Sequence, residues 1–153
     1  MAAEKVKDNV AVPLGFQYTS VVANFFALRE LELSTMLYSS VKVNRDDRSV
    51  EIMLPVSKVD PMALGCVRAW GCTCDGNRER MVICPFHAAA SQTYLLYTTF
   101  RERCDQEGFP FSPTIDGDVM SKKQMVGTIK VVRTHLGLDD DDGDQGHIFR
   151  VSG

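Results

Sequence analysis

The sequence predicts a mainly helical α+β domain with a small three-stranded antiparallel sheet. Apolar residues recur at helical spacing in three segments, and two short runs rich in β-branched residues flank a polar turn. A third β-like run follows them, before the second helical segment. With 153 residues, of which 44% are hydrophobic and 24% charged, the chain has the size and composition of one folded domain.

The first helical segment is expected between Thr19 and Leu37, after a flexible lead-in formed by residues 1–15. Its apolar positions recur at helical spacing and are Val22, Phe25, Phe26, Leu33, Met36 and Leu37. We expect a break or bend of this segment near Arg29. Residues 16–153 are then predicted to form a single domain.

A β-hairpin is expected next along the chain. The runs 41–43 and 50–56 are rich in Val and Ile, and the polar stretch 44–48 between them has the composition of a turn. Residues 66–70 are expected to add a third strand. These three strands make up the predicted antiparallel sheet.

A second long helix is expected to begin at Cys84-Pro85-Phe86-His87, where Pro85 suits the first helical turn. The Gly- and Pro-containing stretch 108–113 is expected to follow its end as a loop. The predicted inner stripe of this helix consists of Phe86, Ala90, Thr93, Leu96, Tyr97, Phe100 and Cys104.

The third helix has the clearest signals in the sequence. Ser121 and Gln124 have the spacing of a capping box, and Gly137 is a natural C-terminal stop. The acidic stretch 139–144 beyond it is expected to form a solvated loop. The predicted apolar stripe consists of Met125, Ile129, Val132 and Leu136.

The overall charge of the chain bears on its partners. The net charge is -3 and the pI is about 5.6, whereas DNA-binding domains are usually basic because phosphate contacts dominate their affinity. Strong independent DNA binding is therefore disfavoured, and a mixed solvated surface stands as the alternative to a local basic patch. The cations of the most basic stretch are Lys42, Arg45, Arg48, Lys58, Arg68, Arg78 and Arg80.

The sequence has no signal for a membrane span or for secretion. No apolar run approaches the roughly 20 residues that a membrane helix needs, and residues 1–8 lack the apolar core of a signal peptide. We therefore expect an intracellular protein without a membrane partner. In a reducing compartment its five cysteines are expected to be metal ligands or free thiols rather than disulfides.

A cluster of metal-ligating residue types lies between the third strand and the second long helix. Cys72, Cys74, Cys84 and His87 offer three thiolates and one imidazole, which are preferred ligands of tetrahedral zinc. Four protein ligands leave no open position, so we expect a structural zinc site within an insert spanning residues 66–87, and no organic cofactor. The Cys-x-Cys spacing is tighter than usual, so Cys66 is an alternative ligand, and buried thiols beside a surface histidine are the alternative without metal. The remaining thiol and imidazole of the helical segments, Cys104 and His135, are expected to be structural.

Three further motifs place arginine, lysine and histidine in a fixed order along the chain. The first two lie on the first helical segment and after the hairpin, and the third lies near the end of the sequence. They are Arg29 with Glu32, Ser57 with Lys58, and His147-x-x-Arg150. With the stretch Cys-Pro-Phe-His-Ala-Ala-Ala, this order resembles the catalytic domain of tyrosine recombinases (phage integrases), especially those of eukaryotic mobile elements. The resemblance covers about residues 20–153.

The resemblance implies a role for each residue in attack on a DNA phosphodiester. Arg29 and Arg150 would bind the non-bridging oxygens, because their forked and permanently charged donors match the charge that develops there. Lys58 would protonate the leaving 5′ oxygen, and His147 would assist proton transfer. Glu32, three residues after Arg29 on one helix face, would orient that arginine.

The function expected from the resemblance is DNA recombination or integration, with DNA as partner and the nucleus as location. In this family a tyrosine attacks the phosphate from a later helix, which the resemblance places after Gly153. We therefore expect a domain truncated at its C-terminus that handles DNA without forming the phosphotyrosine by itself. The alternative is a non-catalytic, zinc-stabilised DNA-binding or protein-interaction module derived from a mobile element. Apolar surface left uncovered by truncation would favour a homo-oligomer.

Overall fold

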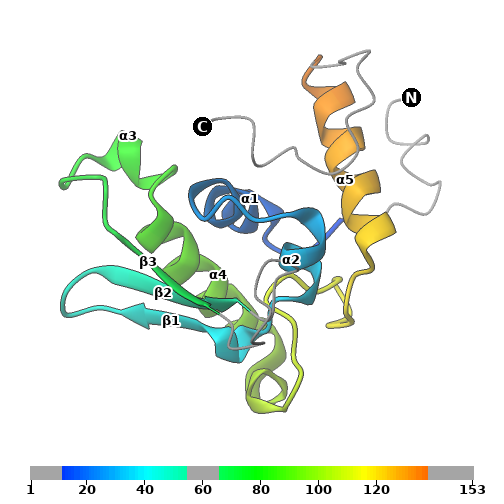
Figure 1. Ribbon diagram of the computed structural model, residues 1–153, viewed down its shortest axis with the longest axis horizontal. Helices are drawn as coiled ribbons and strands as arrows, with labels where there is room; N and C mark the ends of the chain where they lie inside the picture. Colours follow the sequence, from blue (N-terminus) through cyan, green and yellow to red (C-terminus); the bar gives the residue numbers. More distant parts are fainter. Residues whose placement is uncertain (1–11, 55–65, 138–153) are drawn as a thin grey trace.

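The computed structural model describes residues 12–54 and 66–137, and its fold is of the predicted α+β class (Figure 1). None of the helices within these two ranges has the length and the apolar character needed to cross a membrane. The elements in chain order are α1 (Phe16–Phe25), α2 (Glu30–Thr35), η2 (Tyr38–Ser40), β1 (Val41–Asn44), β2 (Ser49–Leu54), β3 (Cys66–Gly71), α3 (Arg78–Met81), α4 (Pro85–Phe100), η3 (Arg101–Asp105) and α5 (Lys122–His135).

The break expected in the first helical segment separates α1 from α2. Ala27 adopts a left-handed conformation with φ 51°, and the N–H of Leu28 donates to the carbonyl of Ala23 over 2.9 Å. This pattern closes the C-terminus of a helix. Arg29 then serves as the N-cap of α2 with extended backbone angles. The expected bend is therefore a complete interruption, and two short helices replace one long one.

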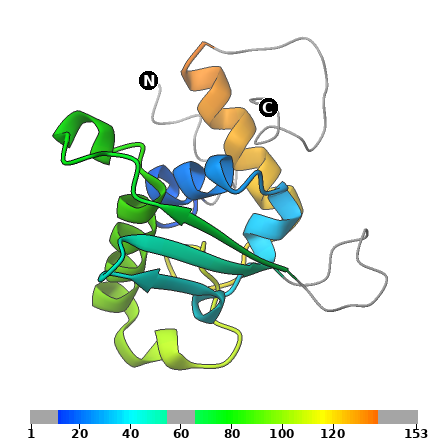
Figure 2. The same ribbon diagram turned by 60° about the vertical axis from the view of Figure 1, so that its left-hand side comes forward.

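The sheet has the order β1-β2-β3 with antiparallel pairing throughout. On β2 the side chains of Val50, Ile52 and Leu54 are buried, whereas those of Glu51 and Met53 are exposed. This alternation means that one face of the sheet covers the core and the other faces outward. Figures 1 and 2 show α4 crossing behind the inner face, so the sheet and α4 form two packed layers.

α4 is the central helix of the molecule, and α1 packs along it. The buried Gln92 of α4 donates hydrogen bonds to the carbonyl oxygens of Leu14 (3.0 Å) and Phe111 (2.9 Å), and so ties the segments before α1 and after η3 to the core. The expected inner stripe is right at Phe86 and Leu96, but Tyr97 is 50% exposed. Ala88, Ala89 and Gln92 are buried instead, because α4 is covered on one side by α1 and on another by the sheet.

Residues 12–15, the described part of the expected lead-in, are attached to the body of the molecule. The N–H of Leu14 donates to the carbonyl of Pro113 over 2.8 Å, and Pro13 and Gly15 are buried. Gly15 has φ 73°, and a Cβ at this position would collide with the side-chain amide of Gln92. The sequence therefore needs a glycine where α1 begins.

α5 follows the predicted capping box. The N–H of Gln124 donates to Ser121 Oγ over 3.1 Å, and the N–H of Ser121 donates to Gln124 Oε1 over 2.9 Å. Met125 and Ile129 are buried as expected, but Leu136 is 64% exposed and does not belong to the inner stripe. α5 contacts α2, its buried residues are Met125, Thr128 and Ile129, and the helix extends away from the sheet (Figures 1 and 2).

Candidate metal centre

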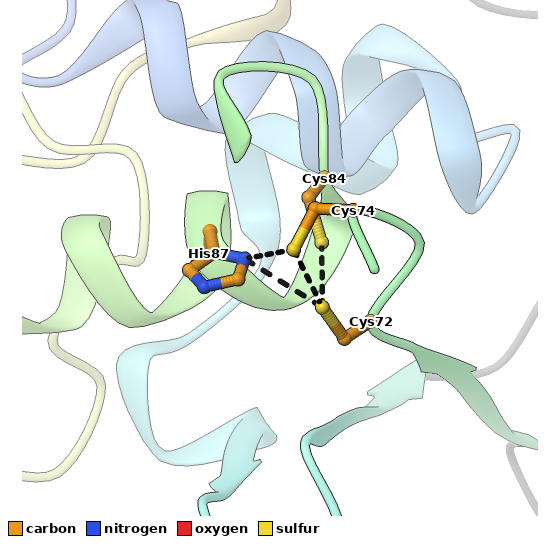
Figure 3. Close-up of side chains that lie close together, drawn as sticks. All are labelled: Cys72, Cys74, Cys84 and His87. Carbon is orange, nitrogen blue, oxygen red and sulfur yellow. Dashed lines mark hydrogen bonds between the residues drawn. The ribbon is translucent and has the colours of Figure 1, made fainter. Parts of the chain in front are cut away.

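The structure brings together the four residues that the sequence predicts as metal ligands. The sulfur atoms of Cys72, Cys74 and Cys84 and a ring nitrogen of His87 all lie within 4.8 Å of one another. The S···S distances are 3.1 Å between Cys72 and Cys74 and 3.6 Å between Cys72 and Cys84. The Nδ1 atom of His87 lies 3.6 Å from Cys74 Sγ and 3.8 Å from Cys72 Sγ (Figure 3).

Cys72 and Cys74 are positioned by the turn that follows β3. The N–H of Cys72 donates to the carbonyl of Arg48 over 2.8 Å, which fixes the end of β3 against the β1–β2 turn. Asp75 (φ 48°) and Gly76 (φ 77°) are both left-handed and reverse the chain immediately after Cys74. This reversal leaves both thiols directed toward the start of α4 (Figure 3).

Cys84 and His87 are positioned by the first turn of α4. Cys84 is the N-cap of that helix and Pro85 occupies its first turn, which suits the fixed φ of proline. His87 is three residues after Cys84, so both side chains lie on the same face of the helix end. The predicted start of this helix is therefore also what brings two of the four ligands together.

The distances fit a tetrahedral ion. Bonds of about 2.3 Å to sulfur and about 2.0 Å to nitrogen separate the ligand atoms of such an ion by roughly 3.5–3.8 Å. The 3.6 Å between Cys72 and Cys84 Sγ and the 3.6 and 3.8 Å to His87 Nδ1 agree with this range. The 3.1 Å between Cys72 and Cys74 Sγ is shorter than this range, so these two sulfur atoms would have to move apart to ligate one ion.

The three thiols differ in how readily they ionise. Burial opposes ionisation of Cys84, but hydrogen bonds from the backbone N–H groups of His87 and Thr73 outweigh it and lower the pKa of this thiol to about 6. Burial raises the pKa of the Cys72 thiol; a backbone hydrogen bond of Cys74 opposes this effect, and hydrogen bonds to the thiols of Cys74 and Cys84 add to it. At neutral pH the cluster thus holds a thiolate at Cys84 and a protonated thiol at Cys72 when no metal is bound.

The cluster has its own small hydrophobic environment. Cys74, Cys84 and Phe86 form a buried group separate from the main core, with Val43 and Cys72 packed against it. The sulfur atoms of Cys74 and Cys84 are buried in these surroundings, and a shell that restricts solvent access favours tight metal binding. The residues between Cys74 and Cys84, including α3, are exposed.

The alternative ligand Cys66 does not reach this cluster. Cys66 begins β3 and pairs with Leu54, whereas Cys72 follows the opposite end of the same strand. A strand rises about 3.3 Å per residue, so the two positions are separated by the whole strand length. Cys104 is 2% exposed and belongs to the main core, in agreement with the expected structural role, whereas His135 is exposed.

The structure describes only Arg29 and Glu32 among the residues that the recombinase resemblance assigns to phosphate handling. Lys58, His147 and Arg150 lie outside the described residues. Glu32 does not orient the Arg29 side chain from the same helix face: Arg29 precedes α2, and the Glu32 carboxylate accepts the backbone N–H of Arg29 over 2.7 Å. The Nε atom of Arg29 is buried and has no hydrogen-bond partner within residues 12–54 and 66–137.

Two features of the charge distribution escape sequence reasoning. Arg48 Nη2 lies 3.7 Å from Cys74 Sγ, so one cation of the basic stretch contacts the metal cluster. The exposed side of α5 borders a hollow of about 670 Å³ lined by Lys122, Lys123, Val126, Gly127 and Lys130. The helical spacing of these lysines is a usable signal, because α5 contains Lys and Arg but no Asp or Glu.

The chain was also compared with known proteins. No protein-family model, no curated protein and no solved structure matches it. The functional interpretation is therefore built on the Cys–His cluster and on the distribution of charge over the described surface.

Proposed function

We propose that the chain binds one zinc ion through Cys72, Cys74, Cys84 and His87, and that this ion is structural. The observation that carries the proposal is the approach of all four ligand atoms to within 4.8 Å of one another. Three thiolates and an imidazole complete a tetrahedron and leave no position for a substrate. Cys72 and Cys74 follow β3, and Cys84 and His87 lie at the start of α4, so the ion would join the end of β3 to the start of α4.

A structural ion suits this part of the fold for an energetic reason. The loop from residue 72 to residue 84 buries only the small group around Cys74 and Cys84, and α3 within it has no buried residue. So short a loop buries too little apolar surface to offset the entropy of ordering its backbone. Metal ligation supplies the missing free energy, as it does in other small metal-bound modules.

Metal analysis of the protein purified without chelator tests this proposal. We expect about one zinc per chain and loss of that zinc in Cys84→Ser. The matched control is Cys66→Ser, since Cys66 is a thiol of the same insert outside the cluster. Zinc retained by Cys84→Ser, or lost equally from Cys66→Ser, would contradict the assignment of these ligands.

We further propose a DNA-binding function of the recombination type, exercised in the nucleus. A local observation favours it despite the acidic pI: the hollow beside α5 is lined by three lysines and by Gly127. A mid-helix glycine is unfavourable by about 1 kcal/mol relative to alanine, and apart from the adjoining turns of α5 itself, nothing in the described ranges comes within 4 Å of a Cβ built there. Gly127 thus leaves room for the close approach of another molecule, and lysines attract phosphate.

The DNA proposal includes the phosphodiester chemistry that the recombinase resemblance implies for Arg29, Lys58, His147 and Arg150. Arg29 would bind a scissile phosphate together with Arg150, with Lys58 and His147 as proton donors. The unpartnered Nε of Arg29 is the observation that supports such a ligand, because a buried guanidinium nitrogen without an acceptor is unfavourable. If Arg29 has no phosphate to bind, the chain is instead a zinc-stabilised interaction module.

Binding to a short mixed-sequence DNA duplex at several salt concentrations tests the DNA proposal. Lys123→Ala with Lys130→Ala should weaken binding and lower the slope of log affinity against log salt by about 1 for each lysine that neutralises a phosphate. The control pair is Lys42→Ala with Arg45→Ala, which removes two cations from the exposed hairpin. Equal losses of affinity in both pairs of variants would show that DNA is attracted diffusely rather than by the hollow beside α5. If the unaltered protein has no measurable affinity for DNA, the DNA proposal fails and the zinc-stabilised interaction module remains as the alternative.

A further inference from the structure

Arg48 makes two contacts with the metal-ligand segment, one through its backbone and one through its side chain. Its carbonyl oxygen accepts the N–H of Cys72 over 2.8 Å. Its Nη2 atom donates to the sulfur of Cys74 over 3.7 Å, across 26 residues of sequence. The end of the β1–β2 turn is therefore in contact with two of the four predicted ligands.

The backbone conformation of Arg48 would suit glycine better than arginine. Its φ is 54°, in the left-handed region where a side chain with a Cβ is disfavoured and glycine is not. A turn ending a hairpin often has glycine at such a position. Compared with glycine, arginine at position 48 makes the left-handed backbone less favourable, but it supplies a guanidinium that reaches the sulfur of Cys74.

The charge of the proposed site gives that guanidinium a role. Three thiolates and a neutral imidazole around a divalent ion leave one net negative charge. Cys74 and Cys84 are fully buried, and a buried charge is costly unless a partner neutralises it. A guanidinium is permanently charged and planar, so it can neutralise the excess and donate a directed hydrogen bond to sulfur.

We propose that Arg48 is a positioning residue of the metal centre, which orients the Cys74 thiolate for ligation and neutralises the excess negative charge of a three-thiolate site. The inference rests on the proposed zinc function. It extends the metal centre from the ligand loop to the β1–β2 turn. Removing a partner of this kind, which touches a ligand rather than the metal, typically changes metal affinity 10–100-fold.

The test uses Arg48→Gly, which keeps the carbonyl that holds Cys72 and suits the left-handed backbone. Zinc affinity is measured by competition with a chromophoric chelator. We expect Arg48→Gly to bind zinc about tenfold more weakly, and Arg48→Lys, which keeps the charge without the planar fork, to fall between Arg48→Gly and the unaltered protein. Arg45→Ala removes a cation from the same turn and should leave the affinity unchanged.

Urea unfolding with and without zinc separates this role from a merely structural one. Without metal, Arg48→Gly should be at least as stable as the unaltered protein, because the turn is relieved; with zinc it should be less stable. An affinity within twofold of the unaltered protein, or an equal loss of stability with and without zinc, would overturn the inference and leave the zinc function standing. Failure of the unaltered protein to bind zinc would overturn both.

Discussion

Cys84 differs from the other thiols of the cluster because α4 begins at this residue. The free N–H groups of a helix start favour a negative charge, and hydrogen bonds from His87 and Thr73 overcome burial to bring the pKa of Cys84 down to about 6. This thiol is therefore ionised before any metal arrives. Cys72, whose pKa is raised by burial, must lose its proton when the ion binds.

The pKa of Cys84 predicts how the stability of the metal-free protein depends on pH. A thiol with a lowered pKa in the folded state stabilises that state above the unfolded pKa and loses this contribution as pH falls through the folded value. Stability should therefore rise as pH increases from about 6 to the ordinary value of 9.0. Urea unfolding of chelator-treated protein across this range measures the slope, and Cys84→Ser should flatten it. Cys66→Ser is the control and should keep the slope, whereas a slope left unchanged by Cys84→Ser would contradict the assignment.

At the residue scale, the sequence predicts the four residues of the Cys–His cluster but not the contact that Arg48 makes with it. The cluster is recognisable because thiols and an imidazole at short spacing are typical of a metal site. Arg48 is one of many cations in its stretch, and its contact with Cys74 arises only when the hairpin turn and the ligand loop meet. A break or bend was expected near Arg29, but propensity does not reveal the left-handed Ala27 that ends α1 and leaves Arg29 as the N-cap of α2.

The start of α1 shows how one glycine connects three segments. Gly15 allows the amide of Gln92 to approach closely enough to bind the carbonyls of Leu14 and Phe111. These hydrogen bonds hold together the segment before α1, the helix α4 and the segment after η3. The arrangement depends both on the left-handed conformation of Gly15 and on the absence of its side chain.

Gly15→Ala should lower the free energy of unfolding by roughly 2 kcal/mol, in part from the left-handed backbone and in part from displaced hydrogen bonds of Gln92. Gly108→Ala is the matched control. Gly108 is also left-handed (φ 83°), yet a Cβ there would meet nothing within 4 Å in the described part of the chain, so only the backbone cost of about 1 kcal/mol applies. Equal losses of stability in the two variants, measured by urea unfolding, would show that the approach of Gln92 contributes nothing.

Element boundaries could be predicted where a local signal marks them. The capping box at Ser121, the proline at position 85 and the polar turn 44–48 each determine a boundary through neighbouring residues alone, and all three predictions are confirmed. Burial along the helices was predicted less well. Tyr97 and Leu136 were expected inside because periodicity shows that a helix has an apolar stripe, not where neighbouring elements stop covering it.

The whole molecule, over the residues described, has two buried groups of unequal size. The larger one joins α1, α2, the sheet, α4 and α5, and the smaller one is limited to the surroundings of Cys74, Cys84 and Phe86. The larger group does not include any of the four metal-ligand residues. The proposed zinc ion would therefore stabilise the loop between residues 72 and 84 rather than the fold as a whole.

If the ion is structural, its removal should make this loop open transiently more often, without unfolding the rest of the chain. Hydrogen exchange after chelation is expected to speed up between residues 71 and 87, while α1 and β2 keep their protection. The far-ultraviolet circular dichroism should change little, because α3 is a single short turn. The control is chelator treatment of Cys84→Ser, which should change nothing further. Loss of protection in α1 and β2 would show that the ion supports the main core.

At the scale of the whole molecule, the order of the segments predicts the fold class. The distribution of charge over the surface could not be predicted from the sequence, because it depends on the fold. A net charge of -3 conceals a helix without a single acidic residue, since composition averages over surfaces that the fold separates. The recombinase resemblance stays a prediction: three of its four proposed catalytic residues lie outside the described residues, so their approach to Arg29 is untested.

The exposed loop between Cys74 and Cys84 also bears on how this sequence can vary. Cys74 and Cys84 are buried in the Cys–His cluster. The nine residues between them contribute nothing to the main core. Closing a longer loop costs little, about 0.6 kcal/mol for each doubling of its length. Insertions or deletions should therefore accumulate here rather than in the hairpin, and this loop is the natural place to graft a tag or a label without disturbing the rest of the chain.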